Sequence, residues 1–211
     1  MELRKLKEEE SYLKAELYRI LKDAIGSGFS VEPYKFIAVL PEVPVDDEKA
    51  DLVVFTDMGV PKPFLIIETK RRTFDKPGVS LANAVKKTRE VYVKKLEGRF
   101  YAVWDGWIML IFKEAYPFLV DACNAEVGDL TAEFGRTLLE GLADMSYRGD
   151  AKRLSQLPRI RDPAFVRRKI FPSVAKYFAQ EWLRSTTREV STQNIEDEKG
   201  RLINQWDKKT L

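Results

Sequence analysis

Two short apolar runs, separated by a turn rich in glycine and proline, constrain the fold of this chain more than any other feature. They predict paired strands at about 50–57 and 63–70, because apolar runs bounded by turn residues are typical of a hairpin. The first strand begins beside Asp51, and the second ends with Glu68 and Lys70. The pairing would therefore bring two carboxylates and one ammonium to neighbouring strand ends.

The charged residues at the ends of these runs indicate a site for a divalent cation. Strand side chains alternate between faces, so Glu68 and Lys70 share a face from which Thr69 points away. A charged pair at the end of such an apolar run is costly to bury without partners. A divalent cation held between Asp51 and Glu68 would offset that cost, because hard cations bind carboxylate oxygens.

The composition excludes several classes of enzyme. The 211 residues contain no histidine and one cysteine, Cys123. Ser-His-Asp triads, Cys-His proteases and histidine-dependent zinc hydrolases are therefore excluded. A single cysteine forms no internal disulfide, and the charged amino terminus lacks the apolar core of a signal peptide, so we expect a cytoplasmic protein. No apolar stretch approaches the roughly 20 residues of a membrane span, and we expect no membrane partner.

Positive charge gathers directly after the hairpin. Residues 62–113 hold 12 Lys and Arg against 5 Asp and Glu, whereas residues 1–61 hold 8 against 13. A solvated protein face explains such a surplus about as often as a nucleic-acid contact, but beside a metal site a phosphate contact is favoured. The candidate phosphate-binding residues are Arg71, Arg72, Lys86, Lys87, Lys94 and Lys95.

The order of elements around the hairpin indicates an α/β fold. We expect a helix at 5–25, a strand at 29–40, an acidic loop at 41–49, the hairpin, a helix at 81–97 and strands at 100–104 and 107–112. Asp105-Gly106 marks the turn between the last two strands. Helix, three strands, helix and two strands predict a mixed β-sheet flanked by helices.

The remaining residues are predicted to be helical. We assign 1–113 to the core and 114–184 to a helical extension packed on it, with helices at about 129–146 and 163–184. Residues 185–211 are polar and show little periodicity, so we expect a mobile tail or a solitary helix there.

The pattern of Asp51 followed by Glu68-Thr69-Lys70 resembles that of the PD-(D/E)xK nucleases, with Ala50 where many members have proline. Over about residues 10–113 the chain is similar to the amino-terminal nuclease domain of type I restriction endonuclease R subunits. The resemblance implies a restriction-endonuclease-like core and Mg²⁺-dependent hydrolysis of DNA, with Mn²⁺ as a substitute. Asp51, Glu68 and the backbone carbonyl of Thr69 would be the metal ligands, and Lys70 would orient or deprotonate the attacking water.

The same resemblance points to a further glutamate on the first helix. Many relatives have an acid there that points at the metal. Glu16 is the candidate, because it lies about three turns before the glycines that end the helix. Glu9 and Glu10 are the alternatives, and an ordinary exposed acid is an equally good interpretation of any of the three.

Restriction-type relatives also have a Gln-x-x-x-Tyr pair on the helix after the Glu-x-Lys strand. Here the pair is Thr88 and Tyr92, whose spacing places both side chains on one helix face. The glutamine is replaced, which weakens any role for Thr88. Tyr92 either lines the site or is a core aromatic.

Three functions remain open at this point. The chain is expected to be a DNA endonuclease of restriction type, either alone or as a module of a larger restriction enzyme. A structure-specific nuclease like the Holliday junction resolvases and a catalytically unused subunit that binds DNA or protein are the alternatives. Partners other than DNA would be a second copy in a homodimer or the subunits of a restriction complex.

Overall fold

The computed structural model describes residues 9–26, 28–57, 59–114, 118–186 and 189–210. Seven strands form one sheet in chain order: β1 Ser30–Val31, β2 Tyr34–Val45, β3 Glu48–Asp57, β4 Pro61–Thr69, β5 Phe100–Trp104, β6 Ile108–Lys113 and β7 Leu119–Asn124. Neighbouring strands are antiparallel except β4 and β5, which are parallel. A parallel pair requires a crossover connection, and a helical segment provides it. The segment comprises α3 Pro77–Lys87, η1 Thr88–Val93 and α4 Lys94–Leu96. The expected mixed sheet is confirmed.

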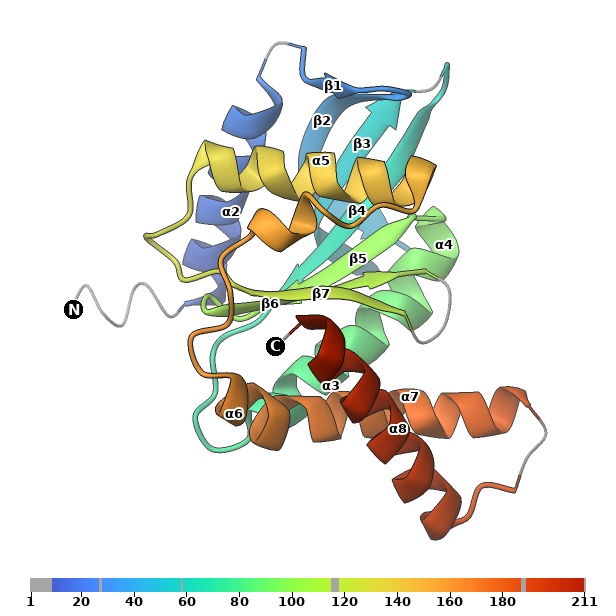
Figure 1. Ribbon diagram of the computed structural model, residues 1–211. Helices are drawn as coiled ribbons and strands as arrows, with labels where there is room; N and C mark the ends of the chain where they lie inside the picture. Colours follow the sequence, from blue (N-terminus) through green and yellow to red (C-terminus); the bar gives the residue numbers. More distant parts are fainter. Residues whose placement is uncertain (1–8, 27, 58, 115–117, 187–188, 211) are drawn as a thin grey trace.

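Helices cover both faces of this sheet (Figure 1). One apolar cluster joins the sheet to α2 Glu10–Ile25 and α5 Ala132–Arg148. A second cluster on the other face joins it to α3, η1, α7 Phe171–Ser185 and α8 Thr192–Thr210. Three short elements complete the chain: η2 Leu154–Gln156, α6 Pro163–Phe165 and η3 Val166–Ile170. None of the helices in the described ranges has both the length and the apolar character needed to cross a bilayer.

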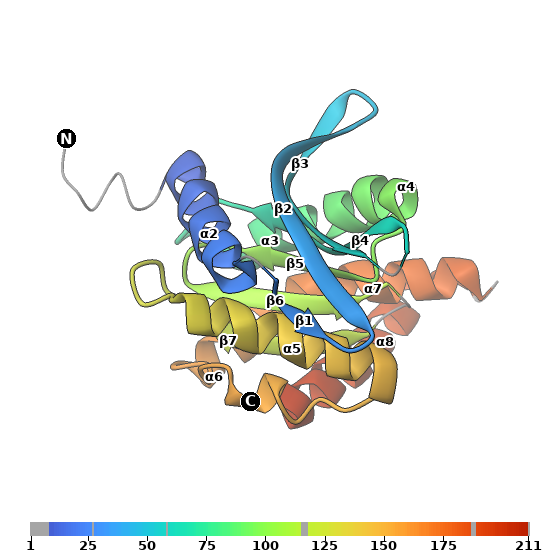
Figure 2. The same ribbon diagram turned by 90° about the horizontal axis from the view of Figure 1, so that it is seen from above.

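The predicted loop at 41–49 is wrong, because β2 and β3 continue through it as a hairpin that turns at Asp46 and Asp47. Pro41 and Pro44 lie in β2 where β3 is its only strand neighbour, since β1 pairs only with residues 34 and 35. Proline is tolerated at such an edge because no ladder bond is needed on the free side. Figure 2 shows this hairpin projecting beyond the rest of the sheet between α2 and α4.

The region after residue 113 contains a strand as well as the predicted helices. It contributes the seventh strand, β7, whose short run interrupted by Asp121 gave no clear strand signal. The terminal segment forms α8, which is neither solitary nor detached from the core. Leu202 and Trp206 are almost fully buried, and the Trp206 ring packs edge-on against Phe171 and Phe178.

Candidate active site at the end of the central strands

Asp51 is held at the end of β4 by two hydrogen bonds. The register pairs Leu52 with Ile67, which leaves Asp51 on β3 opposite the last residues of β4. The backbone N–H and the hydroxyl of Thr69 both donate to Asp51 Oδ2, at 2.8 Å each. The other carboxylate oxygen faces Lys14 Nζ of α2 at 3.6 Å. The carboxylate therefore has a fixed orientation between β4 and α2.

Glu68 is the most deeply buried acid of the site. Its Oε1 lies 2.8 Å from Lys70 Nζ and 3.6 Å from Lys87 Nζ. Its Oε2 is buried and has no hydrogen-bond partner among the described residues. Burial raises the pKa of Glu68 and the charge of Asp51 raises it further, while Lys70 and Lys87 oppose this rise. An unpaired buried carboxylate oxygen is costly.

Lys70 connects the strand end to the first helix. Its Nζ donates to Glu10 Oε1 at 3.0 Å as well as contacting Glu68. Burial lowers the pKa of Lys70, but the hydrogen bonds and charges of Glu68 and Glu10 outweigh burial and raise it overall. Its backbone N–H donates to the carbonyl of Trp104 at 2.8 Å, which ties the end of β4 to the end of β5. The Lys70 ammonium is therefore charged and is held between Glu68 and Glu10.

The helix acid that reaches this cluster is Glu10, one of the two alternatives, and not Glu16. Glu10 opens α2, and Lys14 follows it by four residues on the same helix face. Glu16 instead pairs with Arg19 of its own helix, with 2.6 Å between Oε1 and Nη2. The pKa of Glu16 is lowered chiefly by that hydrogen bond, as expected for an acid in a surface ion pair.

A π-helical turn explains why Lys87, rather than Thr88, faces the site. The segment 88–93 is a π-helix, in which residues five apart become neighbours. The Lys87 ammonium accordingly lies 5.2 Å from the ring centroid of Tyr92 and 3.0 Å from Glu48. Thr88 is buried and donates to the carbonyl of Ala84. Tyr92 is fully buried, and burial raises the pKa of its hydroxyl while Lys87 opposes that shift.

The other cations proposed for phosphate binding point in several directions. Lys86 lines a groove between α3 and α7, whereas Lys94 lines a different hollow near the start of β4. Lys95 pairs with Asp46 at the turn of the β2–β3 hairpin, at 3.2 Å. Arg71 is exposed, and Arg72 stacks on aromatic rings, as described below. These residues do not form one continuous basic face.

Acids of the β2–β3 hairpin neutralise lysines around the site, which the sequence analysis did not predict. Glu42 pairs with Lys14, and Glu48 pairs with Lys87. The i, i+4 relation of Glu10 and Lys14 was visible in the sequence and could have been used. The hairpin acids gave no such signal, because the prolines and acids of their segment are typical of a loop.

Two acids of the cluster have the donor type that hard cations bind. Asp51 and Glu68 supply carboxylate oxygens, and the free Glu68 oxygen is the observation that favours a cation there. Among the residues that the structure describes, no group of three or more acidic or thiol side chains is arranged to hold a metal. Backbone carbonyl and water oxygens would have to complete the coordination.

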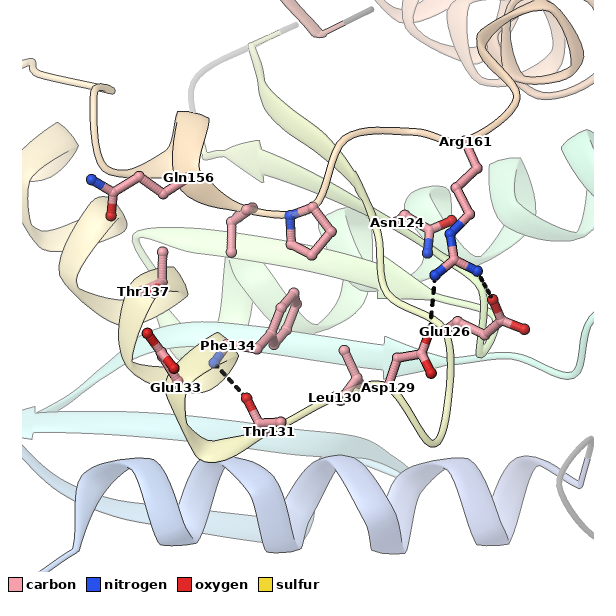
Figure 3. A pocket seen from close by; sticks show the side chains of 12 residues that line it. Asn124, Glu126, Asp129, Leu130, Thr131, Glu133, Phe134, Thr137, Gln156 and Arg161 are labelled. Carbon is pink, nitrogen blue, oxygen red and sulfur yellow. Dashed lines mark hydrogen bonds and ion pairs between the residues drawn. The ribbon is translucent and has the colours of Figure 1, made fainter.

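A separate pocket of about 230 Å³ lies between the start of α5 and the loops after β7 and η2 (Figure 3). Arg161 bridges Glu126 and Asp129 at its mouth, at 2.6 and 2.9 Å. Thr131 caps α5 by accepting from the N–H of Phe134. No predicted site residue lines this pocket, so the candidate site is the strand-end cluster and not this cavity.

Comparison with known proteins adds one distant similarity. No protein-family model and no curated protein matches the chain. A match is found with the crystal structure of the type IIG restriction endonuclease BpuSI, at 16% identity and a TM-score of 0.45. The match covers 86% of this chain and 23% of that chain, so the chain spans about a quarter of the restriction enzyme.

Proposed function

We propose that this chain is a metal-dependent deoxyribonuclease of the PD-(D/E)xK class, an endonuclease of restriction type. The observation that carries the proposal is the convergence of Asp51, Glu68 and Lys70 at the ends of two paired strands. The buried, unpartnered Glu68 oxygen supports a place for a cation in this cluster. The enzyme would act alone or as a module of a larger restriction enzyme.

Asp51 and Glu68 would hold Mg²⁺, with Mn²⁺ as a substitute and the Thr69 carbonyl as a further ligand. The ion would polarise the phosphate and lower the pKa of water. Lys70 has a raised pKa and therefore keeps its proton at neutral pH. This favours a role in orienting the attacking water and stabilising negative charge that develops on the phosphate, and disfavours a role as general base.

Glu10 and Lys87 would support these groups. Glu10 accepts from Lys70 and fixes the direction of its ammonium toward Glu68. Lys87 adds a second positive charge on the side of Glu68 that faces α3. A phosphate entering the cluster would compete with Glu48 and Glu68 for the Lys87 ammonium.

Cleavage assays test the proposal directly. Supercoiled plasmid, linear duplex, single-stranded DNA and a four-way junction are incubated with Mg²⁺ or Mn²⁺ and either wild type or Lys70→Ala. We expect at least one substrate to be cut by wild type and the rate to fall by about 100-fold or more in the variant. Lys209→Ala, which removes an exposed lysine of α8 that contacts the Phe118 ring away from the cluster, is the control. Equal cleavage by Lys70→Ala and wild type would refute the assigned role.

A second function is favoured by the ion pairs of the cluster: a nuclease-like fold that binds nucleic acid without cutting it. Each acid already faces a lysine, with Lys14 beside Asp51 and Lys70 beside Glu68. Lysines that neutralise both acids would make a cation unnecessary. Calorimetric titration with Mg²⁺ and Mn²⁺ separates the two functions, because the binding subunit would take up neither ion at Asp51 and Glu68.

A further inference from the structure

The loop that follows Lys70 exposes an aromatic side chain. Phe74 is 67% exposed, the largest exposed fraction among the large apolar side chains that the structure describes. The Arg72 guanidinium lies 4.9 Å from the Phe74 ring centroid and 4.0 Å from the ring centroid of Trp107. Arg72 thus contacts two aromatic rings, and the outer ring is open to solvent.

The inner part of this stack is firmly anchored. Trp107 packs edge-on against Phe165, with 5.3 Å between ring centroids. Its backbone N–H donates to the buried carboxylate of Asp105 at 3.1 Å, and its carbonyl accepts from Ala125 at 2.7 Å. Asp105 also lies within the electrostatic reach of Arg72. The guanidinium therefore rests on a fixed ring, which lowers the entropic cost of a further stacking partner.

The stack lies at the same end of the sheet as the candidate active site. The hydrogen bond from Lys70 to Trp104 joins the ends of β4 and β5, and Arg72 and Trp107 follow these strand ends closely in the chain. Exposed Arg71 and Lys76 lie in the same loop as Phe74. At the end of this loop, η3 packs tightly on the start of α3. A Cβ added at Gly78 would lie 2.2 Å from the carbonyl oxygen of Lys169, so only glycine allows this approach. The approach brings Lys169 to the end of the loop that holds Arg71 and Lys76.

An aromatic ring beside a planar cation, with exposed basic residues in the same loop, is suited to unpaired nucleobases. Every base has a π-face, and stacking on aromatic side chains and arginine binds single strands without sequence preference. In a duplex these faces are already covered by neighbouring base pairs. The exposed cations would contact the phosphates on either side.

We propose that Phe74, Arg72 and Trp107 form a stacking platform that binds an unpaired nucleobase beside the active site, with Phe74 as the ring that the base contacts. As a statement about the nuclease substrate it rests on the proposed function, and it makes DNA with a single-stranded segment the preferred substrate. As a binding site it stands without catalysis.

Binding without metal tests the platform. Fluorescence anisotropy with EDTA measures the affinity for a labelled thymidine oligonucleotide of about 12 nucleotides and for an abasic oligomer of equal length, which keeps the phosphates and lacks the bases. We expect wild type to prefer the oligonucleotide with bases by about tenfold, and Phe74→Ala to lose that preference. Phe74→Trp should retain it, and Arg72→Lys should weaken it because lysine lacks the planar group.

Phe118 supplies a matched control. It is 37% exposed and has Lys209 Nζ 4.0 Å from its ring centroid, but it precedes β7 at the opposite end of the sheet. Phe118→Ala should bind both oligomers as wild type does. Equal affinity of wild type for the two oligomers, or the same loss in Phe118→Ala as in Phe74→Ala, would overturn the platform.

The failures of the two proposals are distinguishable. If the protein prefers the base-bearing oligonucleotide in EDTA but cuts no DNA, the platform is supported and the nuclease assignment is refuted. If the protein cuts DNA but binds abasic and base-bearing oligomers equally, the platform is refuted and the nuclease assignment is supported.

Discussion

Two buried carboxylates of this molecule, Glu68 and Asp121, differ in the number of charged side chains that contact them. Both are at most 8% exposed, and burial is the main cause that raises the pKa of each. Glu68 lies near the end of β4, where β3, α2 and α3 bring further charged side chains. Asp121 lies within β7, accepts a hydrogen bond from the N–H of Ala122, and has no ion pair within the described part of the chain. Arg159 and Lys209 lower its pKa only through their charge.

A raised carboxyl pKa does not by itself indicate a functional site. Burial alone shifts a pKa, as it does for Asp121. At Glu68 burial is combined with a second acid, two lysines and a free carboxylate oxygen. Strand ends allow this combination, because side chains from several elements meet there.

The largest expected difference between the two acids is in catalysis. Glu68→Gln should reduce DNA cleavage by about 100-fold or more, because stabilisation of charge by a bound metal is worth several kcal/mol. Asp121→Asn, the same chemical change in the other acid, should cleave as wild type does. Initial rates on the best substrate measure both. Comparable losses in the two variants would remove the distinction between them.

The second largest expected difference between the site acids and Asp121 is in metal affinity. Asp51→Asn should weaken Mn²⁺ binding by at least about tenfold, since loss of a group that only supports a metal ligand already costs 10- to 100-fold. Asp121→Asn should leave the calorimetric titration unchanged. Mn²⁺ binding of the same affinity in Asp51→Asn and wild type would show that Asp51 is not a ligand.

Asp121 should instead contribute a pH dependence to the free energy of unfolding. Burial raises the pKa of Asp121 to about 6, so the folded protein retains a proton that the unfolded chain releases above its ordinary value of 3.8. The free energy of unfolding therefore falls as pH rises through this window, and the full penalty is present above pH 6. Asp121→Asn should be more stable than wild type above that window by about 1–3 kcal/mol.

Denaturant titrations of both proteins at several pH values measure the effect. Below the window the two proteins should have nearly equal stability. A constant difference at all pH values would assign the effect to packing, and a less stable variant at neutral pH would show that the Asp121 charge is compensated by Arg159 and Lys209.

The smallest expected effect separates two adjacent lysines. Lys86 is exposed on the α3–α7 groove, whereas Lys87 contacts Glu68. If Lys86 contacts one phosphate, Lys86→Ala should weaken duplex binding a few-fold and reduce the slope of affinity against salt by about 0.9. Lys87→Ala should mainly slow cleavage. An unchanged salt slope in Lys86→Ala would move the phosphate-binding surface away from this groove.

The sequence was sufficient for the parts of the fold that depend on local pattern. The Asp51 and Glu68 strands form an antiparallel hairpin, so their meeting follows from a short turn between two apolar runs. β7 was missed because Asp121 interrupts a six-residue run, and the packing of α8 depends on Trp206 reaching aromatic rings that are distant in the sequence.

The surroundings of the site were less predictable. The choice between Glu10 and Glu16 depends on where α2 begins and which end of it reaches the strand ends. The position of Lys87 depends on a π turn that changes the helix register. No residue pattern in the sequence predicts that turn. Tertiary packing decides both features, so local sequence reasoning could not resolve them.

Anomalous X-ray scattering from crystals soaked in Mn²⁺ tests the central claim most directly, because it locates the ion without assuming activity. We predict one strong peak bonded to carboxylate oxygens of Asp51 and Glu68, at roughly the 2.0–2.6 Å typical of oxygen ligands. Soaked crystals of Glu68→Gln should lack the peak. A wild-type map without a peak at these two acids, or with its main peak elsewhere, would contradict the assignment of this cluster as a metal-dependent nuclease site.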